Sequence, residues 1–253
     1  MENKYNLTTE DNIFLAKRNI VDYVYNSARL EGIAITFSQT EAILSGAKIS
    51  NLTMDEVVTI NNLKHAWQFL FETIDYPMAD YPFICEVNRI IGSGLFNRAG
   101  FIRNIPVKIG GTSWKPDMPL ESQIKDDISD ILNIKADTNR ALTLMLYLMR
   151  KQMFLDGNKR TATLCANKIL ITAGAGVLSV DVDDIEEFKN KLIVFYETND
   201  MLDIKTFLYK KCIDGAIIKE ISPDEIKAQQ DRTRMFDEFR NSIDKVKSLD
   251  GDL

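Results

Sequence analysis

A short polar run in the second half of the chain has the residue types of an anion-binding loop. The run FLDGNKR, residues 154–160, separates two segments with helical apolar spacing, at roughly 138–153 and 158–173. The first backbone N–H groups of a helix have no intrahelical acceptor, and the helix dipole places partial positive charge at the same end. Phe154 is expected to anchor the run in the core. The spacing therefore predicts a phosphate site at the start of the second helix.

The side chains of this run fit the same chemistry. Gly157 allows the backbone to approach a ligand closely, while Lys159 and Arg160 add positive charge and a bidentate fork suited to phosphate. Asp156, beside such a phosphate, is placed to hold Mg²⁺. A polar run of this composition before a helix is also typical of an ordinary turn with a cap, so the run by itself leaves both interpretations open.

Three motifs of the chain resemble those of the Fic family and follow the family's order. Residues 152–160, QMFLDGNKR, resemble the Fic motif His-x-Phe-x-(Asp/Glu)-Gly-Asn-(Gly/Lys)-Arg at every defining position except the first. Residues 98–103 and 107–111 resemble the flap that lies over the Fic site. Residues 27–32, SARLEG, resemble the inhibitory motif (Ser/Thr)-x-x-x-Glu-(Gly/Asn). The resemblance extends over roughly residues 10–210.

The resemblance implies a helical protein that binds ATP with Mg²⁺. Members of this family move AMP, or less often another phosphate-containing moiety, onto a hydroxyl side chain of a target protein. By the same resemblance Asp156 would hold the metal ion and Arg160 would contact the phosphates as part of the catalytic machinery. The implied nucleotide-binding residues are Gly157, Asn158, Lys159 and Arg160.

The other two motifs imply an inhibitory group and a docking segment. Glu31, with Ser27 in the same motif, would project from the N-terminal helix into the phosphate region. The flap would grip the target protein by strand addition, in which an extended peptide hydrogen-bonds to an exposed strand. The implied target-binding residues are Val107, Lys108, Ile109 and Gly110.

Two positions depart from the family's pattern. The first motif residue is a histidine in the family, where it takes the proton from the attacking hydroxyl, and this chain has Gln152. A carboxamide is not a base near neutral pH, and loss of a general base lowers rates by about 10²- to 10⁴-fold. Thr163 stands where many members carry a second arginine. Glu31 would therefore have to act through Lys159, Arg160 or direct repulsion of the phosphates.

The replaced histidine leaves three interpretations open. The leading one is a Fic-type adenylyltransferase scaffold that is impaired or inactive because of Gln152. The alternatives are a phosphate-transferring variant, since lysine at position 159 leaves the orientation of the nucleotide open, and a non-catalytic interaction protein with the same fold. The single histidine, His65, is expected on a helix surface or as a hydrogen-bonded core residue, and it is not assigned the missing role.

The remaining sequence predicts an all-α, mainly helical fold with one short β-hairpin flap. Helical spacing starts after Thr8 or Thr9 and continues to about Gly32, and a capping box at residues 53–56 introduces a long helix. Residues 101–114, which alternate in places and contain two adjacent glycines, are the strand candidate. The other expected helices lie at about 38–44, 82–91, 120–132, 138–153, 158–173, 183–196 and 202–213.

Three parts are expected along the chain. Residues 1–50 would form N-terminal helices that include the inhibitory-type helix, and residues 51–214 the Fic core. Residues 215–253 would form a helical extension, which begins with a capping pattern at Ser222 and carries an apolar stripe. Such a stripe packs either on its own core or on a partner.

The bulk composition narrows the classes of partner. The formal net charge of −6 argues against a broad electrostatic footprint for nucleic acid or an anionic membrane, and any anion site must be local. The most apolar run is too short to span a bilayer, and the polar N-terminus predicts no signal peptide, so we expect a cytoplasmic protein. Cys85, Cys165 and Cys212 lack metal-ligand spacing and are expected to be reduced and mostly buried. The oligomeric state stays open, a homo-oligomer included.

Overall fold

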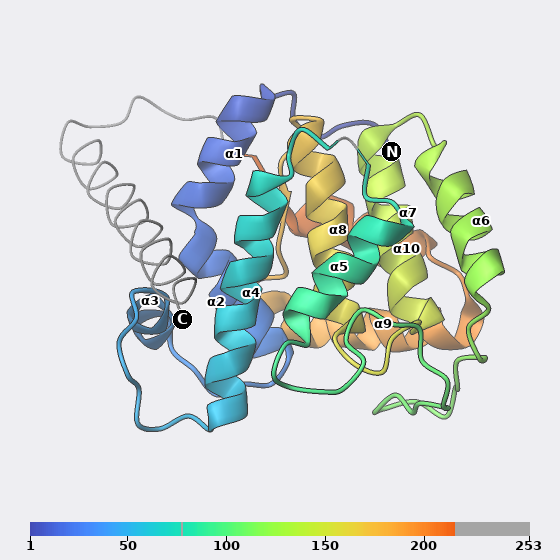
Figure 1. Ribbon diagram of the computed structural model, residues 1–253. Helices are drawn as coiled ribbons and strands as arrows, with labels where there is room; N and C mark the ends of the chain where they lie inside the picture. The colour runs from blue at the N-terminus through green and yellow to red at the C-terminus, as the bar shows by residue number, and fades with distance from the viewer. Residues whose placement is uncertain (77, 216–253) are drawn as a thin grey trace, which may run out of the picture. The chain divides into compact units, whose positions relative to one another are not determined.

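The computed structural model describes residues 1–76 and 78–215, and the helix expected after Ser222 lies outside them. Within these residues the chain is mainly helical (Figure 1), which confirms the predicted fold class. The helices are α1 (Thr9–Arg18), α2 (Ile20–Leu30), α3 (Phe37–Leu44), α4 (Met54–Glu72), α5 (Tyr81–Ile91), α6 (Glu121–Leu132), α7 (Asp137–Lys151), α8 (Asn158–Thr172), α9 (Ile185–Thr198) and α10 (Leu202–Lys211), with a 3-10 turn at Val182–Asp184.

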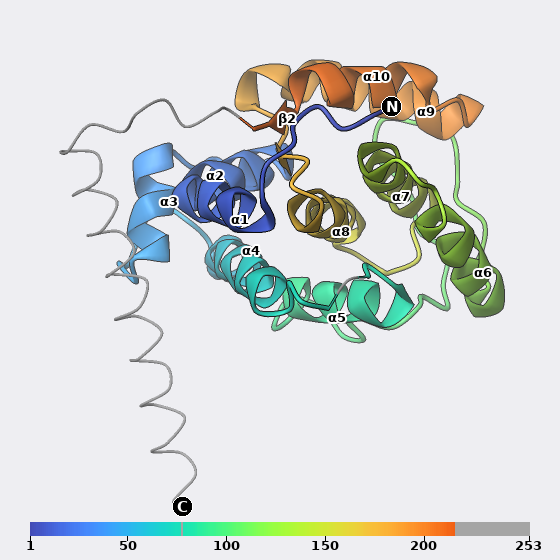
Figure 2. The same cartoon turned by 90° about the horizontal axis from the view of Figure 1, so that it is seen from above.

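Helix α8 lies at the centre of residues 1–215. Viewed from above in Figure 2, it is surrounded by α1, α4, α5 and α7, all of which pack against it, α7 most extensively. Most of its side chains are buried, because small and apolar residues occur on all faces of the helix. Its buried amide Asn167 is hydrogen-bonded on both sides, donating to Leu178 O at 2.8 Å and accepting from Leu178 N–H at 2.7 Å.

The helix starts follow the capping signals of the sequence, and one expected helix is divided. At α4 the Thr53 hydroxyl accepts from Glu56 N–H at 3.3 Å while the Glu56 carboxylate accepts from Thr53 N–H at 2.8 Å, as the capping box predicted. The single helix expected up to Gly32 was wrong. Asn19, a weak helix former, takes φ −101° and ψ 18° and separates α1 from α2, so each half packs on its own neighbours.

The strands lie elsewhere than predicted. Residues 101–119, all of which the structure describes, form no strand, and strands β1 (Val177–Leu178) and β2 (Ile213–Asp214) pair antiparallel instead. The predicted hairpin flap is therefore an extended segment without β-pairing. Its prolines have no N–H to give to a ladder. The two real strands are too short to show alternation in the sequence.

Other expectations of the sequence agree with the described residues. The three cysteines are free, with Cys165 and Cys212 buried and Cys85 half-buried. Burial raises the pKa of each of these thiols. Among the helices that the structure describes, none has the length and apolar character needed to cross a membrane.

A fully buried lysine lies in the central helix. Lys168 is 0% exposed; its ammonium donates to the carbonyl of Thr73 and lies 5.6 Å from the ring centroid of Phe83. Burial lowers its pKa from the ordinary value of 10.5 to about 8, and the negative charge of Asp75 opposes this shift. Below about pH 8 the folded chain buries a charged lysine, whereas above 10.5 the lysine is neutral in both folded and unfolded chains.

We predict that Lys168→Met changes how stability depends on pH. The natural chain bears the cost of a buried charge below about pH 8 and is relieved of it as pH rises toward 10.5. The stability of the variant relative to the natural chain should therefore fall by up to about 3 kcal/mol between roughly pH 7 and pH 10. Urea unfolding at both pH values measures this difference. The exposed Lys48→Met is the control, and a pH-independent difference for Lys168→Met would contradict the account.

Candidate functional site

The motif loop, residues 152–157, connects α7 to α8 and contains two left-handed residues. Gln152 ends α7 at φ 48°, and Gly157 precedes α8 at φ 75°. Phe154, 1% exposed, anchors the loop in the core as predicted. The side chain of Asn158 closes the loop from inside, accepting from Phe154 N–H at 3.0 Å and donating to Phe154 O at 2.9 Å. Asn158 thus shapes the predicted anion loop with its side chain turned inward.

The start of α8 has no side-chain cap among the described residues, as is also the case for α2, α6, α7, α9 and α10. The N-cap residue, Gly157, has no side chain that could accept from the backbone donors of the first turn, and the amide of Asn158, the first helical residue, is used inside the loop. Those donors and the positive end of the helix dipole remain for an external anion. The geometry therefore fits the predicted phosphate site.

A buried amide on α5 holds the loop from below. Asn88, 0% exposed, donates to Asp156 O at 3.0 Å and to the Thr161 hydroxyl at 3.1 Å, and it accepts from Gly100 N–H at 2.9 Å. A Cβ at Gly157 would lie 3.1 Å from the Asn88 amide nitrogen, so the close fit requires glycine at that position. Asn88 was missed in the sequence, since an asparagine within a helix gives no signal of such a role.

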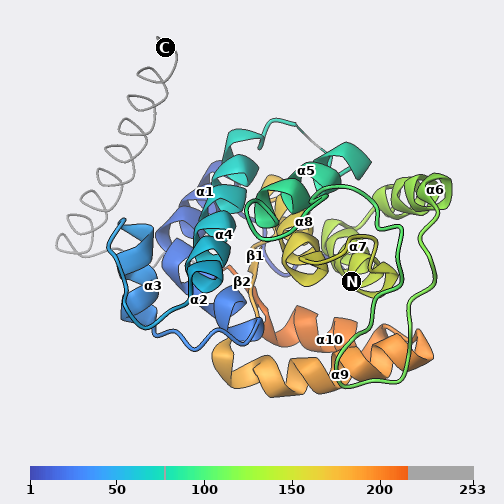
Figure 3. The same cartoon turned by 60° about the horizontal axis from the view of Figure 1, so that its bottom comes forward.

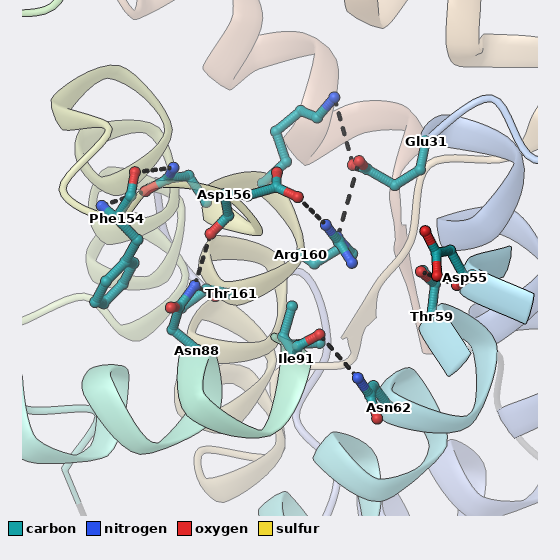
Figure 4. Close-up of polar contacts among 12 residues, drawn as sticks. Glu31, Asp55, Thr59, Asn62, Asn88, Ile91, Phe154, Asp156, Arg160 and Thr161 are labelled. Atoms are coloured by element: carbon teal, nitrogen blue, oxygen red, sulfur yellow. Dashed lines mark hydrogen bonds and ion pairs between the residues drawn. The ribbon is translucent and has the colours of Figure 1, made fainter. Parts of the chain in front are cut away.

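A buried arginine lies between two acids at the start of α8 (Figure 4). Arg160 is 6% exposed; its Nη2 donates to Asp156 at 3.2 Å, and its Nε lies 3.8 Å from a carboxylate oxygen of Glu31. Its Nε and Nη1 have no hydrogen-bond partner among the described residues. Unpartnered buried donors on a charged group are costly, and they fit a site whose acceptor is an external anion.

Glu31 reaches this cluster from the end of α2. Its carboxylate lies 3.4 Å from the Lys159 ammonium and 3.8 Å from Arg160. These are the two cations through which Glu31 was expected to act, since position 163 is not an arginine. Thr163 takes no part, because its hydroxyl donates to Lys159 O at 3.0 Å within the helix. Ser27 supports Glu31 through its main chain, accepting from Glu31 N–H at 3.2 Å.

A cavity of about 440 Å³ brings the three sequence motifs together. The lining includes Glu31, Gln152, residues 107–111 of the flap and residues 155–159 of the motif. Arg160 is not a lining residue, but it is ion-paired with two that are, Asp156 and Glu31. The flap runs from α5 past the start of α8 to α9 before it turns back to α6 (Figure 3). The four flap positions predicted from the sequence thus lie at one cavity with the predicted anion loop.

One wall of the cavity was not predicted. It comes from α9, which lies beside the flap (Figure 3). An apolar stripe at helical spacing marks a buried face, but nothing in the sequence shows that part of the face borders a cavity. The residues of this wall are Phe188, Lys189, Leu192, Ile193 and Tyr196.

The charges around the cavity favour an anionic ligand. Lys108, Lys159 and Lys189 line it, against two carboxylates, Glu31 and Asp156. The buried guanidinium of Arg160 adds a further positive charge beside both acids. A chain with a net charge of −6 therefore has a local cationic pocket, as the composition required of any anion site.

The first motif position offers no base. The Gln152 side chain donates to Met149 O at 2.6 Å and accepts from the Asn158 amide at 3.2 Å. Burial raises the pKa of the neighbouring Tyr196 far above its ordinary value, with hydrogen bonding to Gln152 as a smaller opposing effect, so its phenolate is not accessible near neutral pH. His65 is exposed on α4 and does not line the cavity, in agreement with a helix-surface residue.

A second cavity, of about 390 Å³, lies between parts of α7 and α8. Its arginine, Arg140, is already occupied by an ion pair with Asp137 and a hydrogen bond to Ile134 O. This cavity therefore lacks unpartnered guanidinium donors like those of Arg160.

The chain is thus a mainly helical domain in which the start of α8 and residues 107–111 line one cavity. Residues 79–170 match the profile of the Fic/DOC family, and the chain belongs to that family. Protein adenylyltransferase fic-1 of Caenorhabditis elegans is 30% identical over 183 residues, which make up 68% of this chain and 36% of that protein. Its namesake in Caenorhabditis briggsae is 29% identical over 181 residues. The chain spans only 36% of the length of these curated relatives.

Solved structures show the same fold. A structure of Fic-1 from Caenorhabditis elegans has a TM-score of 0.68 and 24% identity, covering 88% of this chain and 64% of that chain. A Fic domain containing signaling protein from Bacteroides thetaiotaomicron has a TM-score of 0.67 and 21% identity, covering 80% of this chain and 86% of the other. At these identities the likeness concerns the fold.

We predict that Gly157→Ala disrupts the loop. The variant would hold an L-residue at φ 75° with its Cβ only 2.8 Å from Ile91 Cγ2, so unfolding should require about 1–3 kcal/mol less free energy. Gly110→Ala is the matched control, since it lines the same cavity and its Cβ would meet no atom within 4 Å. Thermal and urea unfolding of both variants provide the measurement. Equal stability of the two variants would contradict the requirement for glycine at position 157.

Proposed function

We propose that this chain binds ATP with Mg²⁺ at the motif loop and is built to transfer AMP to a hydroxyl side chain of a target protein. The observation that carries the proposal is the cavity in which the uncapped start of α8, the flap and Glu31 meet around the partly unpartnered Arg160. In this proposal Gln152 impairs the transfer, and Glu31 occupies the phosphate region.

The residues present fit a nucleotide triphosphate with one metal ion. The free donors of Arg160 and of the α8 start suit phosphate oxygens, and Lys159 adds a mobile positive charge. The exposed carboxylate of Asp156 would contribute one ligand to Mg²⁺, which commonly binds through one or two carboxylates and the phosphates of its substrate. The metal would draw charge from the phosphate oxygens as a Lewis acid.

The proposed reaction needs a proton acceptor at position 152. The target hydroxyl oxygen would bond to the α-phosphorus while the bond to pyrophosphate breaks, and the hydroxyl proton must leave. Gln152 has no basic atom, and both ends of its amide are already hydrogen-bonded within the loop. Binding and positioning groups would thus persist without the group that moves the proton. A loss of about 10²- to 10⁴-fold in rate follows.

The target protein would dock on the flap. Residues 104–110 form no backbone–backbone hydrogen bond with any described residue, and apart from Ile105 O, which accepts from Arg103, their N–H and C=O groups are available to an added strand. Val107 and Ile109 lie half-buried at the cavity, beside the loop where the modified hydroxyl would have to arrive. Main-chain pairing there would bring the target side chain to the phosphates.

A non-catalytic interaction protein is the second candidate. It is favoured by the side-chain amide of Gln152, whose nitrogen and oxygen are both hydrogen-bonded within the protein. Such a protein would keep the nucleotide pocket and the flap as a docking surface. A phosphate-transferring variant is a third candidate because of Lys159, whose ammonium reaches the same region as Glu31. The label experiment below separates these possibilities.

We predict that Glu31→Gly strengthens nucleotide binding. Removing the carboxylate frees Lys159 and Arg160 for phosphate, so the Kd for ATP with Mg²⁺ should fall by about tenfold, the effect of roughly 1.4 kcal/mol. Titration calorimetry measures the affinity. Glu31→Gln should give a similar gain, whereas the exposed Glu41→Gln should leave the Kd unchanged. Absence of binding in both the natural chain and Glu31→Gly would refute the ATP site.

We predict that Gln152→His creates or restores transfer. A histidine supplies the missing base, so incorporation of label from α-labelled ATP into the protein itself or a target should rise by about 10²-fold or more. Adding Asp156→Ala to this variant removes the proposed metal ligand and should abolish the gain. Label from the γ position alone would favour phosphate transfer. No label from either position, with nucleotide binding retained, would favour the interaction protein.

A further inference from the structure

A second arginine of the chain is buried without serving the cavity. Arg103 is 2% exposed and is not among the residues that line the 440 Å³ cavity. Its guanidinium hydrogen-bonds to main-chain carbonyls and one thioether, and none of its hydrogen bonds goes to a carboxylate. The acceptors are Gln152 O at 2.6 Å, Ile105 O at 2.9 Å, Met118 Sδ at 3.3 Å, Pro116 O at 3.5 Å and Asp117 O at 2.5 Å.

These acceptors belong to three separate places in the chain. Ile105 lies where the flap begins, residues 116–118 lie where it ends, and Gln152 is the left-handed residue at the first motif position. The main chain of Arg103 joins the same group, since its N–H donates to Met153 O at 2.9 Å. The Arg103 side chain thus links the two ends of the flap to each other and to Gln152, the position at which the family has its catalytic histidine.

The chemistry of the guanidinium explains why arginine occupies this position. Burial lowers the pKa of Arg103, with the charge of Asp117 acting in the opposite direction, so the buried cation is tolerated through its hydrogen bonds. A planar fork with five donors can reach carbonyls in several directions, whereas a lysine ammonium is a point charge with three donors. Lysine is therefore not equivalent here.

The far arm of the flap packs on α9. Trp114 stacks on Tyr196 with ring centroids 5.5 Å apart, and the Arg150 guanidinium lies 4.6 Å from the Trp114 ring centroid. Thr112 donates to Glu197 at 2.7 Å beside it. The flap therefore has two attachments, an aromatic one at its arm and the Arg103 one at its base. The second attachment binds the main chain of the motif directly, at the Gln152 carbonyl.

We propose that Arg103 is a positioning residue that closes the base of the flap and fixes the flap relative to position 152. This inference rests on the proposed function only for its catalytic consequence, because the closure itself is a property of the folded chain. It predicts that loss of the guanidinium fork releases the flap while the surrounding helices stay folded. Arg103 touches no proposed ligand, so its effect would be exerted through the flap and the Gln152 carbonyl.

The test measures release of the flap in Arg103→Lys and Arg103→Met. Trp114 reports on the flap arm, whereas the other tryptophan, Trp67, is 3% exposed in the core. Acrylamide quenching should rise by about twofold or more, and tryptic cleavage after Lys108 should become about tenfold faster, as loss of hydrogen bonds to a charged group implies. The helical circular dichroism should be unchanged. Arg89→Lys and Arg89→Met, at an exposed arginine of α5, are matched controls and should behave as the natural chain does.

Two outcomes would overturn the proposal. If either Arg103 variant folds and its acrylamide quenching and tryptic cleavage rate equal those of the natural chain, the flap does not depend on the Arg103 guanidinium. Loss of the whole helical fold in both variants assigns Arg103 to general stability instead of flap positioning.

The catalytic consequence has a separate readout. In the Gln152→His chain, Arg103→Lys should lower transfer by about tenfold, while Arg89→Lys should not. Flap release without nucleotide binding would uphold the Arg103 proposal and refute the proposed function. Nucleotide binding without flap release would refute the Arg103 proposal and leave the proposed function standing.

Discussion

The N–H groups in the first turn of a helix have no acceptor within the helix and need one elsewhere. In this chain the first turn of α8 borders a cavity. The N-cap residue of α8 is Gly157, which has no side chain, and the amide of Asn158 is hydrogen-bonded to Phe154 inside the loop. The left-handed Gly157 brings the chain onto α8 against Ile91 and Asn88, where no side chain fits. The remaining parts of the site, cations, flap and Glu31, are arranged around this uncapped helix start.

Glu31 has a structural role as well as the proposed inhibitory one. Arg160 is 6% exposed with two unpartnered nitrogens, and a buried cation of this kind needs a nearby negative charge. Glu31 and Asp156 supply that charge in the folded chain, and phosphate would supply it in a complex. Inhibition and stabilisation would then be the same interaction. An anion that enters must displace Glu31 from Lys159 and Arg160, which links nucleotide affinity to the position of α2.

The sequence predicted the parts of the fold that are specified locally. The capping box at Thr53 placed the start of α4, and the three motifs predicted which segments meet at the cavity. Roles that depend on distant partners were not visible. Asn88 and the α9 wall carry no local signal, and the two-residue strands gave no alternation. The predicted flap hairpin failed for a related reason, since alternation indicates an extended backbone but not the presence of a pairing strand.

An extended segment without β-pairing needs side chains to hold it, and this constraint connects the flap to the motif loop. A hairpin would have satisfied its own backbone, whereas this flap leaves residues 104–110 unpaired and is fastened at its base by Arg103. The same guanidinium binds the carbonyl of Gln152, so the available backbone and the first motif position share one support. In the proposed reaction a strand added to the flap would therefore be held in register with the phosphates. Positioning of the target would persist even where the catalytic base is absent.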